Sequence, residues 1–194
     1  ITQEVDGEGK FQKELGDRKH FGHVRIHLEP NRRGEGIVIL NEMDPSVIPP
    51  EYHAAIREGL EDALSSGVVS GYPVTDVVVT MTGGTHREGE STPAGYRIAA
   101  AAAFREGSLQ GGPILMEPIM SVDILTPSEF MGDVIGDINS RKGEVQNVAP
   151  KGNVSEIRAR VPLRQMFGYS TDLRSATQGR ATFTMQFLRY DRAP

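Results

Sequence analysis

Apolar and polar residues alternate near the start of the chain, and this alternation predicts strands. Residues 3–29 contain two strand-like segments, and the second has the two-residue period of a strand with one buried face. The residues of that strand expected to face the core are Val24, Ile26 and Leu28. Residues 30–36 are rich in turn formers, and the apolar run 37–40 predicts a short third strand.

A helix is predicted over residues 51–66, where apolar residues return every three or four positions. Its expected buried stripe comprises Tyr52, Ile56, Leu60, Ala63 and Leu64. Two prolines precede the stripe, as is common in a first helical turn, and Gly67 is expected to end the helix.

A further strand is predicted at residues 74–81, and residues 83–87, Gly-Gly-Thr-His-Arg, predict a loop after it. Thr92 is expected to cap a second helix, which has a proline in its first turn and ends at Gly107. The alanine run in this helix has little side-chain volume, so the helix can lie close to a sheet.

A Gly-Gly-Pro sequence at residues 111–113 predicts a boundary between two domains, 1–115 and 116–194. The second domain has the order strand, helix, strand, strand, helix, strand, which is the βαββαβ ferredoxin-like motif. Thr126 and Glu129 form the pattern of a capping box before its first helix.

Glycines are expected to end both helices of the second domain, at Gly143 and Gly179. The last helix has an apolar face formed by Met166, Phe167, Leu173, Ala176 and Thr177. The strand that follows alternates in polarity and is expected to be half-buried. Its apolar residues are Ala181, Phe183, Met185 and Phe187.

The composition limits the class of protein. With 38% hydrophobic and 24% charged residues in 194, the chain is expected to be globular. It has no cysteine, which excludes disulfides and cysteine–zinc sites. No apolar run approaches the roughly 20 residues that span a bilayer, and the first residues do not resemble a signal peptide, so no membrane partner is expected.

The charge is uneven along the chain. The net charge is −5, which argues against broad, non-specific binding of nucleic acid. Residues 1–115 carry 11 basic and 17 acidic side chains, whereas residues 116–194 carry 10 and 9. An RNA contact would therefore have to be a local patch, and most of the acidic side chains are interpreted as solvated surface.

Several stretches carry a family signature. The most specific are residues 129–145, EFMGDVIGDINSRKGEV, and residues 166–187, MFGYSTDLRSATQGRATFTMQF. Others are FGHVRIHLEP at 21–30, ALSSGVVSGYPVTDVVVT at 63–80 and PILMEPIM at 113–120. Together they resemble the fourth and fifth domains of elongation factor G, the ribosomal translocase, from about Gly7 to Tyr190.

The resemblance implies an α+β fold with two α/β-sandwich domains. Residues 1–115 would form a ribosomal-protein-like βαβ domain that corresponds to the fourth domain. Residues 116–194 would form the ferredoxin-like βαββαβ domain that corresponds to the fifth. The chain starts abruptly and without an initiator methionine, which we interpret as a piece excised from a longer parent.

The resemblance also implies a function, which is ribosome binding in support of GTP-dependent translocation of tRNA and mRNA in the cytoplasm. GTP and Mg²⁺ would belong to the parent protein, because no phosphate-binding loop, G-x-x-x-x-G-K-[ST], occurs here. This chain is therefore expected to have no cofactor and no catalysis of its own. Its partners would be ribosomal RNA, tRNA, mRNA and the proteins of the large-subunit GTPase-associated centre, and it would be a monomer.

In this family the tip of the fourth domain enters the A site on the decoding side of the ribosome. Residues 15–20 stand where the family reads Gly-Gly-Arg-Gly-Gln, and His86 aligns with the histidine modified to diphthamide in the eukaryotic counterpart. The implied RNA-binding residues are Arg18, Lys19, His20, His86 and Arg87. The loops 16–21 and 83–90 should lie side by side, and ordinary charged turns are the alternative interpretation. The departures from the family pattern favour a divergent paralogue that recycles, protects or regulates ribosomes.

The fifth domain of the family lies against large-subunit RNA and protein. The residues here that would make such contacts are Tyr169, Arg174, Gln178 and Arg180. The alternative is that the cations among them stabilise the carboxyl end of a helix.

A third hypothesis is a metal-dependent enzyme that uses His20, His23 and His27. Glu29 could complete such a site, but Arg25 would share a strand face with His23 and His27 and repel a cation. Ordinary strand surface is the favoured interpretation of these histidines.

Overall fold

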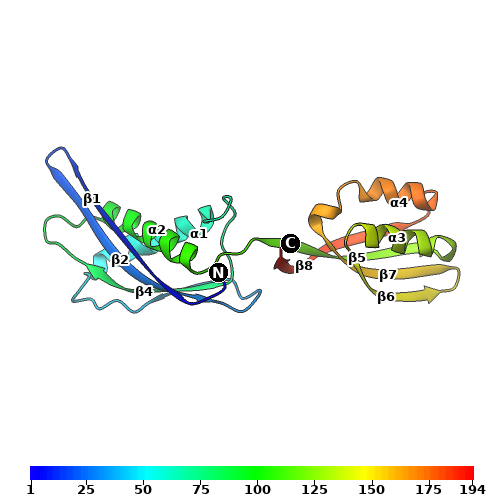
Figure 1. The fold of residues 1–194 in the computed structure, drawn as a ribbon, viewed down its shortest axis with the longest axis horizontal. Coiled ribbons are helices and arrows are strands. Elements are labelled where there is room, and N and C mark those ends of the chain that lie inside the picture. Colours follow the sequence, from blue (N-terminus) through cyan, green and yellow to red (C-terminus); the bar gives the residue numbers. More distant parts are fainter. The chain divides into compact units, whose positions relative to one another are not determined.

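The computed structural model describes residues 1–194, which divide into two compact units, Ile1–Leu115 and Met116–Pro194 (Figure 1). Each unit combines helices with one sheet and has its own cluster of buried apolar side chains. The expected α+β class with two sheets is therefore confirmed. No helix is both long enough and apolar enough to cross a bilayer.

The first unit contains a four-stranded sheet of order β1-β2-β4-β3. Strands β1 (Val5–Leu15) and β2 (Arg18–Pro30) form an antiparallel hairpin. Strand β4 (Val77–Thr85) pairs antiparallel with β2 and parallel with β3 (Ile37–Asn41).

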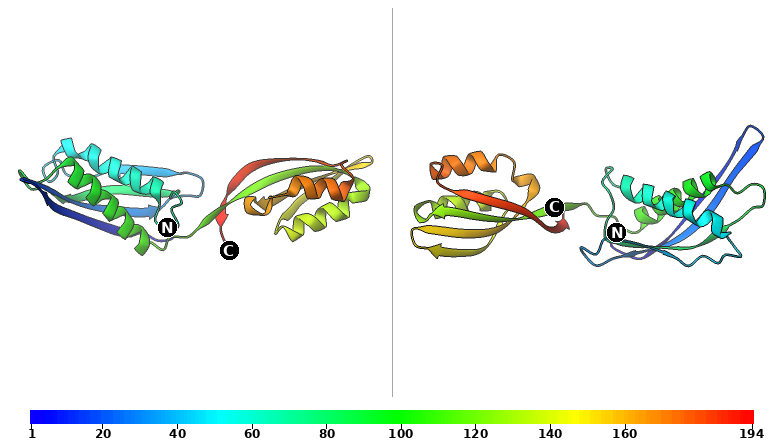
Figure 2. Two further views of the ribbon diagram at one scale, coloured as in Figure 1. Left: turned by 90° about the horizontal axis from the view of Figure 1, so that it is seen from above. Right: turned by 180° about the vertical axis from the view of Figure 1, so that it is seen from behind.

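Two helices cover one face of this sheet (Figure 2). Helix α1 (His53–Ser66) follows a 3-10 turn at Pro50–Tyr52 and connects the parallel strands β3 and β4, which gives a βαβ unit. Helix α2 (Pro93–Gln110) follows β4. Val24, Ile26 and Leu28 of β2 are almost fully buried in this core, as their alternation predicts.

The backbone of α2 lies very close to the β1–β2 hairpin. A β-carbon added at Gly9 would lie 2.0 Å from the carbonyl oxygen of Ala99. A β-carbon added at Gly22 would lie 2.2 Å from the carbonyl oxygen of Gly95. Only glycine fits at these two strand positions, so small residues on both elements hold the helix against the hairpin.

The start of α2 agrees with the prediction, whereas its end does not. The Oγ1 of Thr92 accepts a hydrogen bond from the backbone N–H of Gly95 at 3.0 Å, as an N-cap should. The predicted end at Gly107 is wrong, because the helix continues to Gln110. A β-carbon at Gly107 would lie 2.9 Å from Cδ1 of Leu28, so this glycine serves close packing.

Strand β4 begins and ends later than predicted. Residues Gly83, Gly84 and Thr85 were expected in a loop, but they pair with β2 beyond a bulge at Arg25/Ile26. A β-carbon at Gly84 would lie 2.0 Å from the carbonyl oxygen of His23. Gly84 therefore marks a close approach of two backbones, and not a turn.

The second unit has the predicted βαββαβ order. Its strands are β5 (Met116–Pro127), β6 (Glu144–Lys151), β7 (Val154–Pro162) and β8 (Thr182–Arg192). They form a sheet of order β6-β7-β5-β8 in which all neighbours are antiparallel.

Both helices of this unit lie on the same face of its sheet (Figure 2). They are α3 (Met131–Ser140), after a 3-10 turn at Ser128–Phe130, and α4 (Tyr169–Thr177), after a 3-10 turn at Leu163–Gln165. The buried apolar side chains of both helices and of β5 and β7 form one core.

The predicted capping box is wrong. Thr126 is buried in β5, where its hydroxyl donates to the carbonyl of Pro127 at 3.3 Å, and no side chain caps α3. Glu129 pairs with Arg180 instead. A capping box needs Thr126 directly before the helix, but β5 runs to Pro127 and keeps Thr126 inside a strand.

The predicted glycine at the end of α3 has a different role. The left-handed residue there is Lys142, with φ of 57°, and the helix ends at Ser140. Gly143 donates its N–H to the carbonyl of Ile138 at 2.9 Å. A β-carbon at Gly143 would crowd that carbonyl at 2.8 Å, so the position needs a small residue.

The last helix and strand differ in part from the prediction. Helix α4 begins only at Tyr169, and Phe167 before it is 82% exposed instead of buried. Gly179 is left-handed, as predicted, and follows a left-handed Gln178. In β8 the ring of Phe183 packs on Tyr169, but Met185 and Phe187 are exposed, so the expected half-buried face does not extend along the strand.

Candidate nucleic-acid interface

The two loops expected to form a tip do lie together. The hairpin turns at Gly16 and Asp17, and the segment 86–91 follows β4 beside the returning strand. The backbone N–H of Phe21 donates to the carbonyl of Glu90 at 2.9 Å, and Nζ of Lys19 lies 3.1 Å from a carboxylate oxygen of Glu90. The prediction that both loops meet at one end of the first unit is confirmed.

Phe21 anchors the loop on the hairpin. Its side chain is only 1% exposed, although it lies on the strand face opposite the helices. The guanidinium of Arg87 stacks over its ring at 4.0 Å and the ammonium of Lys10 lies at 5.8 Å. Arg87 was expected at an RNA contact, but its first structural role is to cover this ring.

Acidic side chains neutralise part of the tip. Lys19 pairs with Glu90 and, at 4.0 Å, with Glu14. The hydrogen bond to Glu90 raises the pKa of Lys19, and the same bond lowers the pKa of Glu90. Arg87 shares Glu90 at 3.7 Å. Arg18 is exposed and forms no ion pair, so it is the cation of the tip most available to a phosphate.

The two tip histidines are held by neighbouring side chains. His20 places Nδ1 3.1 Å from the hydroxyl of Thr92, the residue that caps α2. His86 places Nδ1 3.2 Å from the hydroxyl of Tyr96, and that hydroxyl donates to the carbonyl of Thr85 at 2.9 Å. Tyr96 is a buried residue of α2 that no motif indicated.

The histidines of β2 are not brought together as a metal site. The two nitrogens of His23 contact Thr85 at 2.7 Å and Glu8 at 2.5 Å. Nδ1 of His27 contacts Asp6 at 2.7 Å, whereas His20 contacts Thr92.

One possible ligand group does form around His27. Ligand atoms of Glu4, His27 and Glu29 lie within 4.8 Å of one another. Only one imidazole takes part, Glu4 is exposed and Glu29 is half-buried, and such acidic groups are common without an ion.

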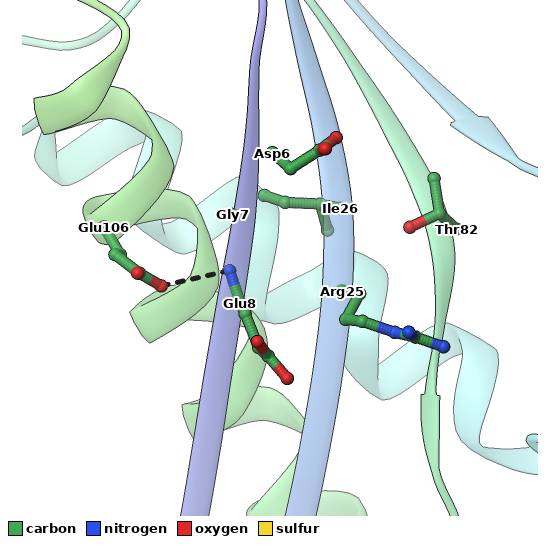
Figure 3. Close-up of a pocket in the computed structure, with 7 residues that line it drawn as sticks. All are labelled: Asp6, Gly7, Glu8, Arg25, Ile26, Thr82 and Glu106. Carbon is green, nitrogen blue, oxygen red and sulfur yellow. Dashed lines mark hydrogen bonds between the residues drawn. The ribbon is translucent and has the colours of Figure 1, made fainter.

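A pocket lined mainly by polar residues lies beside β1 and β2 (Figure 3). Its volume is about 520 Å³, and it is lined by Asp6, Gly7, Glu8, Arg25, Ile26, Thr82 and Glu106. The carboxylate of Glu106 accepts a hydrogen bond from the backbone N–H of Glu8 at 3.1 Å (Figure 3). None of the tip residues lines this pocket, so the tip hypothesis does not depend on it.

The candidate residues of the second unit differ in accessibility. Arg174 and Gln178 are exposed near the end of α4, and Arg180 is exposed while it pairs with Glu129 and stacks over Phe130 at 4.9 Å. Tyr169 is buried against Phe183 and offers no surface to a partner. Its expected ribosome contact is therefore replaced by a role in the core.

Arg141 binds several groups of the segment before α4. In the sequence, only its i,i+4 spacing from Asp137 indicates such a role. Its Nε lies 2.9 Å from Asp137, and its Nη1 donates to the carbonyls of Gln165 at 2.6 Å and Phe167 at 3.2 Å. It also pairs with Asp172. These contacts hold the segment that exposes the ring of Phe167.

Comparison with known proteins accounts for both units. Residues 1–112 match the family model described as "Elongation factor G, domain IV", and residues 114–194 match "Elongation factor G C-terminus". Elongation factor G 2 of Syntrophus aciditrophicus (strain SB) is 58% identical over 191 residues, which are 98% of this chain and 28% of that protein.

A similar fold is known from a crystal structure of a Thermus thermophilus protein. It matches with a TM-score of 0.91 and 31% identity, over 100% of this chain and 29% of that one. The chain thus spans less than a third of the length of either relative. Since the two family models together cover nearly all of its residues, the chain belongs to the elongation factor G family.

Proposed function

We propose that this chain is the ribosome-binding C-terminal part of an elongation factor G-like translation factor that supports GTP-dependent movement of tRNA and mRNA. The observation that carries the proposal is the convergence of two loops at one end of the unit that matches domain IV. An exposed, unpaired Arg18 lies at the end of this hairpin. The parent factor would act in the cytoplasm and bind the ribosome as a monomer.

The tip would contact RNA in the ribosomal A site, on the decoding side, through Arg18, Lys19, His20, His86 and Arg87. A locally basic hairpin end in an acidic unit suits a restricted contact with a phosphate backbone. Lys19 and Arg87 share Glu90, so an approaching phosphate would compete with that carboxylate for both cations. Arg18 would meet no such competition.

The second unit would contact ribosomal RNA and the proteins of the GTPase-associated centre through Arg174, Gln178 and Arg180. Arg174 and Gln178 are exposed around the end of α4. An exposed guanidinium and an exposed amide can bind phosphates and base edges. GTP and Mg²⁺ would bind elsewhere in the parent, and this chain would bind neither.

One feature favours a related function, ribosome recycling or protection. Strands β1 and β2 pair up to Leu15 and Arg18, so the hairpin ends in a tight turn at Gly16 and Asp17. Most of the glycines that the family resemblance implies for this position are absent. A tip of different shape could serve a paralogue that separates the ribosomal subunits.

The test uses the full-length parent factor, because its other domains would supply much of the interface. Arg18, Lys19, His86 and Arg87 are replaced singly and together by alanine, and ribosome affinity is measured as a function of salt concentration. Each lost phosphate contact should reduce the salt slope by about one. Arg32→Ala is the matched control, since it removes an exposed cation at the other end of β2.

Two activities separate the candidate functions. If the combined variant loses tRNA movement, the factor is a translocase; if it loses only the splitting of ribosomes, the factor is a recycling paralogue. Unchanged affinity, movement and splitting would show that the tip is ordinary solvated surface.

A further inference from the structure

Tyr96 connects helix α2 to the tip through its hydroxyl group. The residue is fully buried, and its Oη lies 2.9 Å from the carbonyl oxygen of Thr85 and 3.2 Å from Nδ1 of His86. Burial raises the pKa of Tyr96, so the hydroxyl keeps its proton near neutral pH. A buried phenol with three polar neighbours, the carbonyl of Thr85, the imidazole of His86 and the hydroxyl of Ser91, is thus built into the base of the loop that carries His86.

The positions of the hydrogens follow from these partners, since the Ser91 hydroxyl has a hydrogen of its own to donate to the oxygen of Tyr96. A carbonyl oxygen can only accept, so the single hydroxyl hydrogen of Tyr96 is donated to Thr85, the nearer partner. The contact between Tyr96 and Nδ1 of His86 then needs a hydrogen on Nδ1. A neutral imidazole carries one N–H, which leaves Nε2 of His86 as a free acceptor.

The ring of His86 packs beside Tyr52 and remains partly exposed. It packs against the ring of Tyr52 with centroids 5.3 Å apart, and its side chain is 18% exposed. A carboxylate oxygen of Glu88 lies 3.5 Å from Nε2. The Glu88 side chain is 99% exposed, so this pair is weak and does not determine the tautomer.

We propose that Tyr96 is a positioning residue that fixes His86 as the Nδ1–H tautomer, so that Nε2 accepts a hydrogen bond from RNA. The groups of RNA that can donate are the ribose 2′-hydroxyl and the amino groups of bases. Phosphate oxygens carry no hydrogen at neutral pH, so this nitrogen does not bind a phosphate. The inference rests on the proposed function of the tip and names the class of group that His86 recognises.

The first experiment tests the tautomer without a ribosome. In the 194-residue chain labelled with ¹⁵N, long-range ¹H–¹⁵N spectra at slightly alkaline pH distinguish Nδ1–H from Nε2–H for His86. The wild type should show Nδ1–H, Tyr96→Phe should show a mixture, and Tyr52→Phe, which removes a neighbouring hydroxyl, should match the wild type. A wild-type Nε2–H tautomer overturns the inference. Tyr96→Phe keeps the buried ring, and unchanged amide spectra elsewhere would show that it folds.

The second experiment measures ribosome binding by the full-length parent at several salt concentrations. His86→Ala should weaken affinity about fivefold to tenfold, as the loss of one hydrogen bond does, with an unchanged salt slope. Arg18→Ala should instead reduce the slope by about one. Tyr96→Phe should weaken affinity by a similar factor, and adding it to His86→Ala should have no further effect.

The outcomes separate this inference from the proposed function. A smaller salt slope for His86→Ala means that His86 contacts phosphate, which overturns the inference and keeps the RNA-binding tip. A Tyr96→Phe variant that binds like wild type, while His86→Ala binds weakly, overturns the role of Tyr96 alone. Full affinity and unchanged slopes for both His86→Ala and Arg18→Ala refute the tip contact and the inference together.

Discussion

At Gly9 the backbone of β1 touches α2, and no room remains for a methyl group. The added β-carbon would lie 2.0 Å from the carbonyl oxygen of Ala99, a backbone atom that can move only with its helix. We expect Gly9→Ala to lower the free energy of unfolding by about 1–3 kcal/mol, the usual cost of overpacking. Urea denaturation followed by amide signals of the first unit measures this.

Gln12→Ala is the control for Gly9→Ala, since Gln12 is an exposed residue of the same strand. It should change the free energy of unfolding by no more than about 0.5 kcal/mol. Equal stability of the two variants would contradict the close approach of α2.

A second prediction at the residue scale concerns His27. The hydrogen bond that His27 donates to Asp6 raises the pKa of His27, and the charges of Asp6, Glu29 and Glu4 act in the same direction. A raised pKa in the folded state stabilises the fold fully below the unfolded value of about 6.5, and this stabilisation is lost as pH rises through the folded pKa. Asp6→Asn should therefore destabilise the first unit at about pH 5.5 and have little effect at about pH 8.5.

The comparison for Asp6→Asn is Asp17→Asn, which removes the same charge at the exposed hairpin turn. Denaturation curves at both pH values should show a pH-dependent loss only for Asp6→Asn. If both variants lose the same stability at each pH, the His27–Asp6 bond contributes nothing specific.

At the scale of elements, one side chain begins α2 and also reaches the tip. The hydroxyl of Thr92 accepts from the N–H of Gly95 at 3.0 Å and lies 3.1 Å from Nδ1 of His20. We expect Thr92→Ala to cost about 1 kcal/mol of unfolding free energy, whereas Thr92→Ser should keep most of the stability. Thermal and urea denaturation test this, and a Thr92→Ala variant as stable as Thr92→Ser would show that the cap is dispensable.

Elements defined by a local period could be predicted from the sequence. The core face of β2 and the body of α1 follow from the spacing of their own apolar residues. The end of β4 could not be predicted, because it depends on partners in β2, far away in the chain and beyond a bulge. The apparent capping box failed for a related reason, since sheet pairing keeps Thr126 inside β5.

In the candidate site, too, local features could be predicted from the sequence and contacts between distant residues could not. The cations of the tip could be found from the hairpin and loop sequences together with the family resemblance. The neutralisation of these cations by acidic side chains could not be predicted, because Lys19 and its partner Glu90 are 71 positions apart. Tyr96 was also missed, since a tyrosine in a buried helix stripe indicates only packing, and its hydroxyl contacts are visible only in the folded chain.

At the scale of the whole molecule, each unit carries its own core. The first unit is closed by backbone hydrogen bonds from Thr2 and Gln3 to the carbonyl of Gly111. The second unit begins with β5, which pairs on both sides with strands of its own sheet. We propose that residues 1–115 and 116–194 are independent domains.

Each domain expressed alone should therefore fold. We expect dispersed amide spectra for residues 1–115 and for residues 116–194, and cooperative unfolding of each. A cut after residue 104, inside α2, is the control and should unfold the first domain. A disordered spectrum for either separate domain would contradict the proposed division.

A prediction for the complete chain concerns nucleotides. It has no phosphate-binding loop, and we expect titration calorimetry with GTP or GDP, with and without Mg²⁺, to give only the heat of dilution. The full-length parent is the positive comparison. Saturable micromolar binding by this chain would refute the assignment of GTP to other domains.

The hairpin has a mechanical consequence as well as a chemical one. Beyond Gly22, towards the turn, no glycine of the hairpin packs on α2. There β1 and β2 continue as a two-stranded ribbon, a cantilever fixed at one end. The segment 86–91 supports this cantilever, because Glu90 pairs with Lys19 and the guanidinium of Arg87 stacks on the ring of Phe21. Because the bending of a cantilever increases steeply with its free length, this brace makes the ribbon much stiffer. If the tip meets RNA as proposed, we expect this support to let the thin hairpin keep its direction under load.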